Sequence, residues 1–462
     1  MKFRVQVVIE SETGKEIQEI GCLDREEARL EEVGVSMAEA KKLLVGIQKT
    51  VVEQQAADYL ALQKHCPHCN QPHRHKGQHQ MMFRTLFGNL TLQSPRLFHC
   101  KCQPQPTLTF SPLTKLLSEN TSPERLYLET KWASLLSFGM TTELLADVLP
   151  LNEKINAASV RNHLQNVAAR SEAGLGNEQF SFIDGCQRDF AALPRPAAPL
   201  TVGIDGGYVR KWDDKKTNFE VIVGKSMPEE GEAKCFGFVQ TYDKKPKRRL
   251  FELLKSQGMQ MNQQVTFFSD GGDDVRDLQW YLNPEAEHYL DWFHITMRLT
   301  VLGQYAKGLR EKYEKLSEDI LKTLERIKHF LWHGNVVRGL EVIEDLEDIL
   351  GGEEVDAATV KKLTKGVEEF YGYIEANERF ITNYGERWRN NETIATGFVE
   401  STVNAVISKR FVKKQQMQWT LKGAHLLIQT RTKVFNGELE KTFREWYPGF
   451  RVTNVQEIKK AA

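Results

Sequence analysis

The chain has 462 residues, of which 40% are hydrophobic and 27% are charged, and its 62 basic side chains balance its 62 acidic ones. The length indicates two to four domains of a globular protein. No apolar run approaches the roughly 20 residues of a membrane span, and residues 1–10 lack a signal-peptide core, so we expect a cytoplasmic protein. The zero net charge gives no global sign of nucleic-acid binding, which would then depend on local basic groups.

Residues 1–64 are expected to form a strand followed by a helix. The apolar positions of the helix recur at helical spacing, at Leu30, Val33, Met37, Ala40 and Leu44. The pattern indicates no function for this region.

Four of the seven cysteines lie close together, at Cys66, Cys69, Cys100 and Cys102. Residues 82–92, between the two pairs, predict a hairpin that turns at Gly88-Asn89. Two thiolate pairs around a hairpin are typical of a zinc ribbon, so we expect one structural Zn²⁺ bound by the four cysteines in residues 65–110. The odd cysteine count favours a metal site over disulfides.

The second cysteine pair is spaced Cys-x-Cys instead of the usual Cys-x-x-Cys, which leaves the ligand set open. A histidine could replace one thiolate, and the candidates are His73, His75, His79 and His99. Four buried thiols without a metal are the alternative, but the polar, histidine-rich surroundings argue against it.

Residues 111–190 are expected to be helical. Ser122-Pro123 is a typical helix start, and two more helices are predicted, around residues 142–149 and 158–167. The third carries side chains of the types that read base edges, namely Arg161, Asn162 and Gln165. We therefore predict a helix-turn-helix-like DNA-binding region, with an ordinary helical connector as the alternative.

A Pro/Ala-rich linker at residues 191–199 precedes a mixed pattern of strands and helices. Strands are predicted at 201–204, 218–224, 235–242, 264–269 and 288–293, and helices at 248–257 and 274–282. A meander of three strands followed by alternating helix and strand is the ribonuclease H-like order, in which the first and fourth strands are neighbours.

A long helical pattern then interrupts the alternation. Residues 298–395 are expected to be all-helical, with one helix ending at His333-Gly334 and another at 359–382. The predicted fold class is therefore multidomain α/β, with a ribonuclease H-like catalytic domain at 200–297 and 396–445, an all-helical insertion, and a zinc ribbon and helical region before them.

Three acidic residues occupy positions suited to a metal site. Asp205 and Asp270 end the first and fourth strands, each followed by two glycines, and Glu400 opens a later helix whose next turn carries Asn404. Such carboxylates can hold two Mg²⁺ ions, which stabilise the attacking and leaving oxygens of a phosphodiester displacement. Asp-Gly pairs after strands are also ordinary turns, so only the whole pattern favours a metal site.

Two features near the C-terminus suggest contacts with DNA. A local basic group suits phosphate contacts, and it contains Lys409, Arg410 and Lys413. Trp419 could stack on an unpaired base, although a core tryptophan is the alternative.

Together these features resemble the DDE transposases of bacterial insertion sequences, in the Kra-type group with an N-terminal zinc motif and a helical insertion. The resemblance runs from about Cys66 to the last helix, and the three acids match the family's triad by context and order. Asp291-Trp-Phe-His294 matches the Asp/Cys-x-x-His signature after the fifth strand. Asp291 and His294 could contact the transferred strand, orient a metal ligand, or fix the start of the insertion.

The resemblance implies an enzyme that binds the terminal inverted repeats of its element and catalyses Mg²⁺-dependent DNA cleavage and strand transfer, with Mn²⁺ as a possible substitute. Its partners would be double-stranded DNA and at least one further copy of the chain, and it would associate with the nucleoid. The alternatives are a metal-dependent nuclease of the same fold and a domesticated zinc-dependent DNA-binding protein without catalysis.

Overall fold

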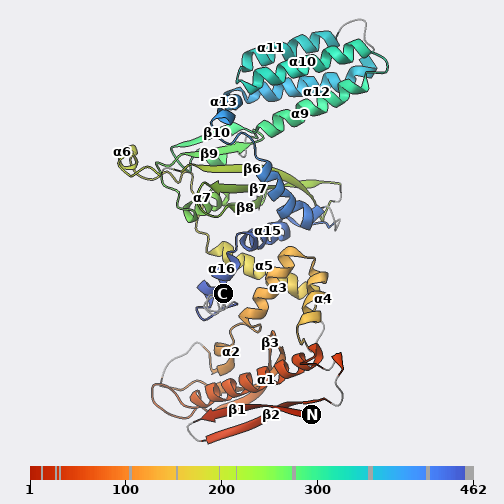
Figure 1. Cartoon of the computed structure of the whole chain (residues 1–462). Coiled ribbons are helices and arrows are strands. Elements are labelled where there is room, and N and C mark those ends of the chain that lie inside the picture. The colour runs from red at the N-terminus through yellow and green to blue at the C-terminus, as the bar shows by residue number, and fades with distance from the viewer. Residues whose placement is uncertain are drawn as a thin grey trace. The chain divides into compact units, whose positions relative to one another are not determined.

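The computed structural model describes residues 1–11, 14–25, 29–30, 33–102, 107–151, 155–196, 198–214, 216–272, 277–351, 357–412 and 417–452. The protein is mixed α/β and divides into two compact units (Figure 1). One comprises Met1–Val167 with Gly437–Ala462, and the other comprises Ala168–Asn436. Among the described helices, none combines the length and apolar character that crossing a bilayer requires.

The first unit begins with a β-hairpin and a long helix. β1 (Lys2–Ser11) pairs with β2 (Gly14–Asp24) in antiparallel fashion, and α1 (Met37–Leu62) packs on the hairpin. A Cβ atom at Gly21 would lie 2.6 Å from Leu43 Cδ2, so this glycine lets the helix approach the strand closely.

The boundaries of this region differ from the prediction in two respects. α1 starts after Ser36, which forms a capping box with Glu39, so Leu30 and Val33 precede the helix. A second strand, β2, was not predicted, because lysine, glutamate and glutamine interrupt the alternation of apolar residues along it.

A three-stranded antiparallel sheet follows, formed by β3 (His75–Thr85), β4 (Gly88–Phe98) and β5 (Thr109–Phe110). The predicted hairpin is confirmed, but its turn lies at residues 86–87, because Thr85 already pairs with Gly88. Gly88 has φ of 119°, a conformation that favours glycine, and it starts the returning strand.

Helices complete the first unit, and they are α2 (Pro112–Leu116), α3 (Pro123–Leu135), α4 (Phe138–Val148), α5 (Ala157–Ala173) and α16 (Leu439–Trp446). The three helices predicted between residues 121 and 170 are thus present. An aromatic cluster joins the C-terminal segment to α3, since the Tyr127 ring lies 5.4 Å from both Phe443 and Phe450. From Ala168 onward, α5 belongs to the second unit.

The second unit, which also contains the short helix α6 (Gln187–Ala191), is built on a five-stranded sheet. Its spatial order is β10 (Ala286–Leu290), β9 (Val265–Ser269), β6 (Leu200–Arg210), β7 (Asn218–Pro228) and β8 (Lys234–Val239). β9 and β10 run parallel to β6, whereas β7 and β8 form an antiparallel meander with it. The predicted adjacency of the first and fourth strands is therefore confirmed. β10 ends at Leu290, three residues earlier than predicted.

Helices cover both faces of this sheet, and they are α7 (Pro246–Ser256), α14 (Gly397–Val403), the π-helix η3 (Asn404–Val412) and α15 (Leu421–Phe435). Val202 and Ile204 of β6 share a buried core with Leu250 and Leu254 of α7. Because side chains alternate along a strand, the intervening Gly203 faces the opposite side, where a Cβ would lie 2.2 Å from Val399 Cγ2 of α14.

Between β10 and α14 the chain is almost entirely helical, as predicted, with α9 (Trp292–Gly308), α10 (Glu314–Trp332), α11 (Val336–Leu350), α12 (Ala357–Ala376), the 3₁₀ turn η2 (Glu378–Phe380) and α13 (Tyr384–Arg389). α9 to α12 lie side by side (Figure 1), and their hydrophobic core extends to Leu290 of β10 and Tyr384 of α13. The predicted stop at Gly334 is confirmed, since its φ is 71°. The helix expected to reach residue 382 ends at Ala376, and the predicted helix 274–282 begins outside the described residues.

Candidate functional site

Asp205 and Asp270 lie at the same edge of the sheet, on neighbouring parallel strands. In the pairing of β6 with β9, Gly203 lies opposite Phe268. Asp205 lies two residues after Gly203, and Asp270 lies two residues after Phe268, so the two aspartates are at equivalent positions on the neighbouring chains. Parallel strands present their carboxyl ends at one edge, which is where the two carboxylates meet.

Asp205 is partly buried and surrounded by other acids. Its Oδ1 accepts a hydrogen bond of 2.7 Å from the Gly206 backbone N–H. Burial raises the pKa of Asp205, and the nearby carboxylates of Asp270 and Asp291 raise the pKa further, whereas Gly206 and His294 oppose them. This edge of the sheet therefore concentrates negative charge that a cation would stabilise.

The loop after β9 holds Asp270 in a defined turn. Asp270 Oδ1 accepts a hydrogen bond of 3.1 Å from the Gly272 N–H, and Ser269 Oγ accepts one of 3.2 Å from the Gly271 N–H. Gly271 has φ of 90°, and a Cβ there would lie 2.2 Å from Asn377 Oδ1. Only glycine fits at this position, which explains the glycine that follows the aspartate.

Asp291 joins the start of α9 to the segment that enters α14. It is fully buried and caps α9 by accepting a hydrogen bond of 2.8 Å from the Phe293 N–H. Its other oxygen accepts hydrogen bonds from the N–H and the hydroxyl of Thr396, and the Nε2 of His294 lies 4.0 Å from it. Burial raises the pKa of Asp291, although the Thr396 contacts oppose this effect.

Of the three roles considered for Asp291, these contacts favour the one in which it fixes where the helical segment begins. Sequence reasoning missed Thr396, although a threonine just before Gly397, at the entry to α14, is the kind of residue that marks a helix start.

Glu400 lies in the first turn of α14 and is exposed. Its neighbour Val399 packs on Gly203 of β6, so the helix crosses the strand that carries Asp205. Asn404 follows one helical turn later and is partly buried. The ligand atoms of Asp205, Asp270 and Glu400 do not all lie within 4.8 Å of one another. Among the described residues, two other groups of potential metal ligands do meet that distance.

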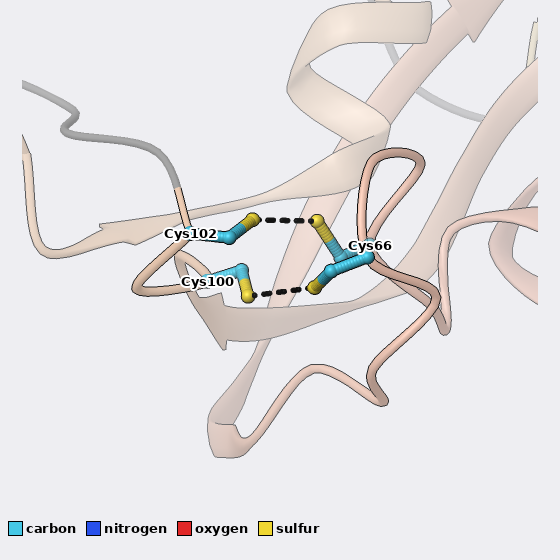
Figure 2. A group of neighbouring side chains, drawn as sticks. Cys66, Cys100 and Cys102 are labelled. Carbon is cyan, nitrogen blue, oxygen red and sulfur yellow. Dashed lines mark hydrogen bonds between the residues drawn. The ribbon is translucent and has the colours of Figure 1, made fainter.

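The four cysteines form the first of these groups (Figure 2). Cys66 Sγ lies 3.5 Å from Cys102 Sγ, and Cys69 Sγ lies 3.3 Å from Cys100 Sγ. Four thiolates around Zn²⁺ at about 2.3 Å lie about 3.8 Å from one another, so the cluster could hold a metal ion with small adjustments.

Backbone N–H groups favour the thiolate form of two of the four cysteines, whereas contacts with the other cysteines raise the pKa of Cys102. N–H groups of Cys69 and His68 lower the pKa of Cys66 to about 6, and the Cys102 N–H lowers the pKa of Cys100. None of the four candidate histidines, all of them described, joins the cluster. His73 and His99 instead pack against the ring of Phe110.

The side chains of α5 that are predicted to read DNA are exposed to solvent, fully or in part. Arg161 and Asn162 are exposed, and Gln165 is partly exposed. On another side of the helix, His163 Nδ1 lies 2.5 Å from Oε2 of the buried Glu129 of α3. This contact orients α5 against α3.

The basic group near the C-terminus is only partly available for DNA. Lys409 is exposed, and Lys413 lies outside the described residues. Arg410 is fully buried, and its guanidinium stacks 5.2 Å from the Trp419 ring. Arg410 therefore presents no cation on the surface, contrary to the prediction that it contacts DNA. Trp419 is itself buried and packs on Phe411, which favours the core alternative.

The second group of potential ligands, Glu172, Asp243 and His425, was not predicted. The guanidinium of Arg249 binds Glu172 at 2.8 Å and Asp243 at 3.0 Å, and His425 Nε2 lies 3.3 Å from Glu172. Although burial opposes it, hydrogen bonds from His425 and Arg249 lower the pKa of Glu172 to about 2. A cation already balances these carboxylates, so we interpret the group as a structural ion-pair network.

Comparison with family models and with curated protein sequences gives no match to the chain.

Proposed function

We propose that the chain is a DNA transposase with a DDE-type site, and that its five-stranded sheet is a ribonuclease H-like domain interrupted by the helices α9 to α13. One observation carries the proposal. Asp205 and Asp270 meet at the carboxyl edge of neighbouring parallel strands, and α14, which bears Glu400, crosses the first of those strands.

In this proposal Asp205, Asp270 and Glu400 hold Mg²⁺. The donor set fits, because carboxylate oxygens are the ligands that Mg²⁺ prefers. Burial and, to a lesser extent, the carboxylates of Asp270 and Asp291 raise the pKa of Asp205, so a cation there would be stabilising. Bound there, Mg²⁺ would activate a water or a 3′-hydroxyl and stabilise the leaving oxygen.

The remaining contacts of the site would position these carboxylates. The Gly206 N–H fixes one oxygen of Asp205, and the Gly272 N–H fixes one oxygen of Asp270. The hydrogen bonds from Thr396 to Asp291 hold the start of α14 against the start of α9, so they would help to position Glu400.

DNA recognition would come from the first unit. The cysteine cluster would hold one structural Zn²⁺ and stabilise the end of the β3–β4 hairpin, while the exposed Arg161 and Asn162 of α5 would contact base edges. Because two ends of an element must be joined, the active species would contain at least two copies of the chain.

The test is cleavage and joining of the DNA that flanks the gene, with Mg²⁺ or Mn²⁺, by wild type, Asp270→Asn and Asp319→Asn. Asp319 is an exposed acid of α10 that contacts Lys322, so it controls for loss of surface charge. We expect wild type and Asp319→Asn to cut at the element's ends and join them to target DNA, and Asp270→Asn to do neither. Specific binding without cleavage by any of the three proteins would contradict the proposal and favour a DNA-binding role.

A further inference from the structure

β6 extends beyond the sheet at the edge where Asp205 and Asp270 meet. Its last pair with β9 is Gly203–Phe268, and the β7–β8 pairing ends at Val221–Val239. From Tyr208 onward, β6 therefore pairs with β7, and an isolated bridge joins Lys211, just after its end, to Trp419. We call residues 208–214 and 216–220 the ribbon.

One face of the ribbon is packed and the other is open. Val209 is fully buried, and a Cβ at Gly207, on the same side of the strand, would lie 2.8 Å from Ile407 of η3. Tyr208 and Arg210 alternate with Val209 and so point to the other side. Tyr208 is 66% exposed, Trp212 is 64% exposed, and Arg210 is exposed as well.

Backbone contacts hold these exposed side chains in place. The Trp212 N–H donates to the Trp419 carbonyl, and the Trp419 N–H donates to the Arg210 carbonyl, both at 3.0 Å. The Lys211 N–H donates to the Thr217 carbonyl at 3.1 Å. The rings of Tyr208 and Trp212 are therefore exposed to solvent on a backbone that hydrogen bonds hold in place. This arrangement suits binding, because the backbone loses little conformational entropy when a ligand binds.

The charges of the ribbon suit a polyanion. Asp213 is paired with Lys211 at 3.4 Å, and Asp214 Oδ1 accepts the Lys216 N–H at 3.0 Å in the turn. Both aspartates thus have partners within the ribbon, and the third acid, the partly buried Glu220, lies opposite Tyr208. Arg210 and Lys216 are exposed.

We propose that the ribbon binds an unpaired DNA strand that enters or leaves the Asp205 edge, with Tyr208 and Trp212 stacking on bases and Arg210 contacting phosphate. An aromatic face combined with a nearby cation is how proteins hold single strands without reading their sequence. At about 3.3 Å per residue, Tyr208 lies roughly 10 Å along the strand from Asp205 but on its other face. One short DNA strand could reach both by passing around the β6 edge, which β9 no longer covers beyond Gly203. The identity of the strand as a cleavage substrate rests on the proposed function.

The test is the affinity for a short fluorescein-labelled oligothymidylate, measured by anisotropy, for wild type, Tyr208→Ala, Trp212→Ala and Trp212→Phe. We expect each alanine variant to bind about tenfold more weakly, in line with the loss of one stacked base, and Trp212→Phe to recover most of the affinity. Trp388→Ala is the matched control, because Trp388 is also exposed, at 63%, but lies in α13. Equal binding by the alanine variants and wild type would overturn the inference, as would wild-type binding to duplex alone.

The cleavage assay separates this inference from the proposed function. If wild type cleaves DNA while the alanine variants keep full affinity for the single strand, only the ribbon inference fails. If affinity depends on Tyr208 and Trp212 but no cleavage occurs, the ribbon inference stands and the transposase proposal fails.

Discussion

Asp291 is the residue on which the start of α9 and the entry to α14 both depend. Replacing it by alanine removes the α9 cap and leaves the Thr396 N–H without its acceptor. A lost cap and an unsatisfied buried donor together predict a loss of about 2–4 kcal/mol in the free energy of unfolding. Asp291→Asn keeps a capping oxygen but turns an amide N–H, which cannot accept, toward the Thr396 N–H, so it should lose about 1–3 kcal/mol. Urea unfolding measures both, and an alanine variant as stable as wild type would refute this role.

Glu172 makes the stability of the second unit depend on pH. Its pKa is about 2 in the folded protein against an ordinary value of 4.5. A carboxylate with a lowered pKa contributes stability above its unfolded pKa, and that stability is lost as the pH falls from about 4.5 toward 2. Glu172→Gln should therefore flatten the acid side of the stability curve measured by urea unfolding. Identical pH dependence in both proteins would show that the network does not act through Glu172.

Arg410 illustrates what could not be predicted at the level of single residues. Its place among Lys409 and Lys413 indicated a surface group, yet its side chain is buried against Trp419. The segment forms a π-helix, with a hydrogen-bond period different from that of an α-helix. The side that each residue faces therefore cannot be read from an α-helical pattern, and the partner is a tertiary contact.

At the scale of elements, the cysteine cluster is the clearest case in which spacing predicted proximity. Cys100→Ser should reduce tightly bound zinc in the purified protein from one equivalent toward none, because three thiolates leave the tetrahedral shell incomplete. Cys22→Ser is the matched control, since Cys22 is exposed and outside the cluster. Zinc content measured by metal analysis should be unchanged in that variant. Zinc retained in full by Cys100→Ser would argue against the four-cysteine site.

α5 carries the prediction for DNA recognition. If Arg161 contacts DNA, Arg161→Ala should weaken binding to the element's ends by about tenfold. A base contact predicts a smaller ratio of specific to nonspecific affinity, whereas a phosphate contact predicts uniform weakening and a salt slope reduced by about one. Anisotropy titrations at several salt concentrations distinguish the two. Unchanged affinity throughout would remove α5 from the interface and leave it as a helical connector.

The elements themselves were largely predictable where apolar runs are short and bounded by turn residues. The five strands of the second unit follow from such runs, whereas the adjacency of the first and fourth was inferred from the ribonuclease H-like order. That adjacency places Asp205 beside Asp270. β2 was missed because its sequence is mostly polar, and the β3–β4 turn was placed two residues late. In both cases the structure of the segment depends on pairing with a neighbouring strand, and that pairing cannot be predicted from the sequence of one segment alone.

For the whole molecule, the sequence predicted which acids to examine but not how closely they lie. Asp205 and Asp270 are brought together by strand register, a local property once the sheet forms. Glu400 depends on where α14 settles after the helical segment α9 to α13, which Asp291 and Thr396 help to determine. The position of α14 relative to the sheet depends on tertiary contacts, which the spacing of residues in the sequence does not predict.

The central claim is that the carboxylates at the edge of the β6–β9 pair form a divalent-cation site. The most direct measurement is the electron paramagnetic resonance signal of free Mn²⁺ during titration into wild type, Asp205→Asn, Asp270→Asn and Asp319→Asn. The account predicts that wild type and Asp319→Asn remove Mn²⁺ from the free pool equally, and that the other two variants bind at least about tenfold more weakly, since each loses a charged ligand. Equal binding by all four proteins would place the cation elsewhere and contradict the account.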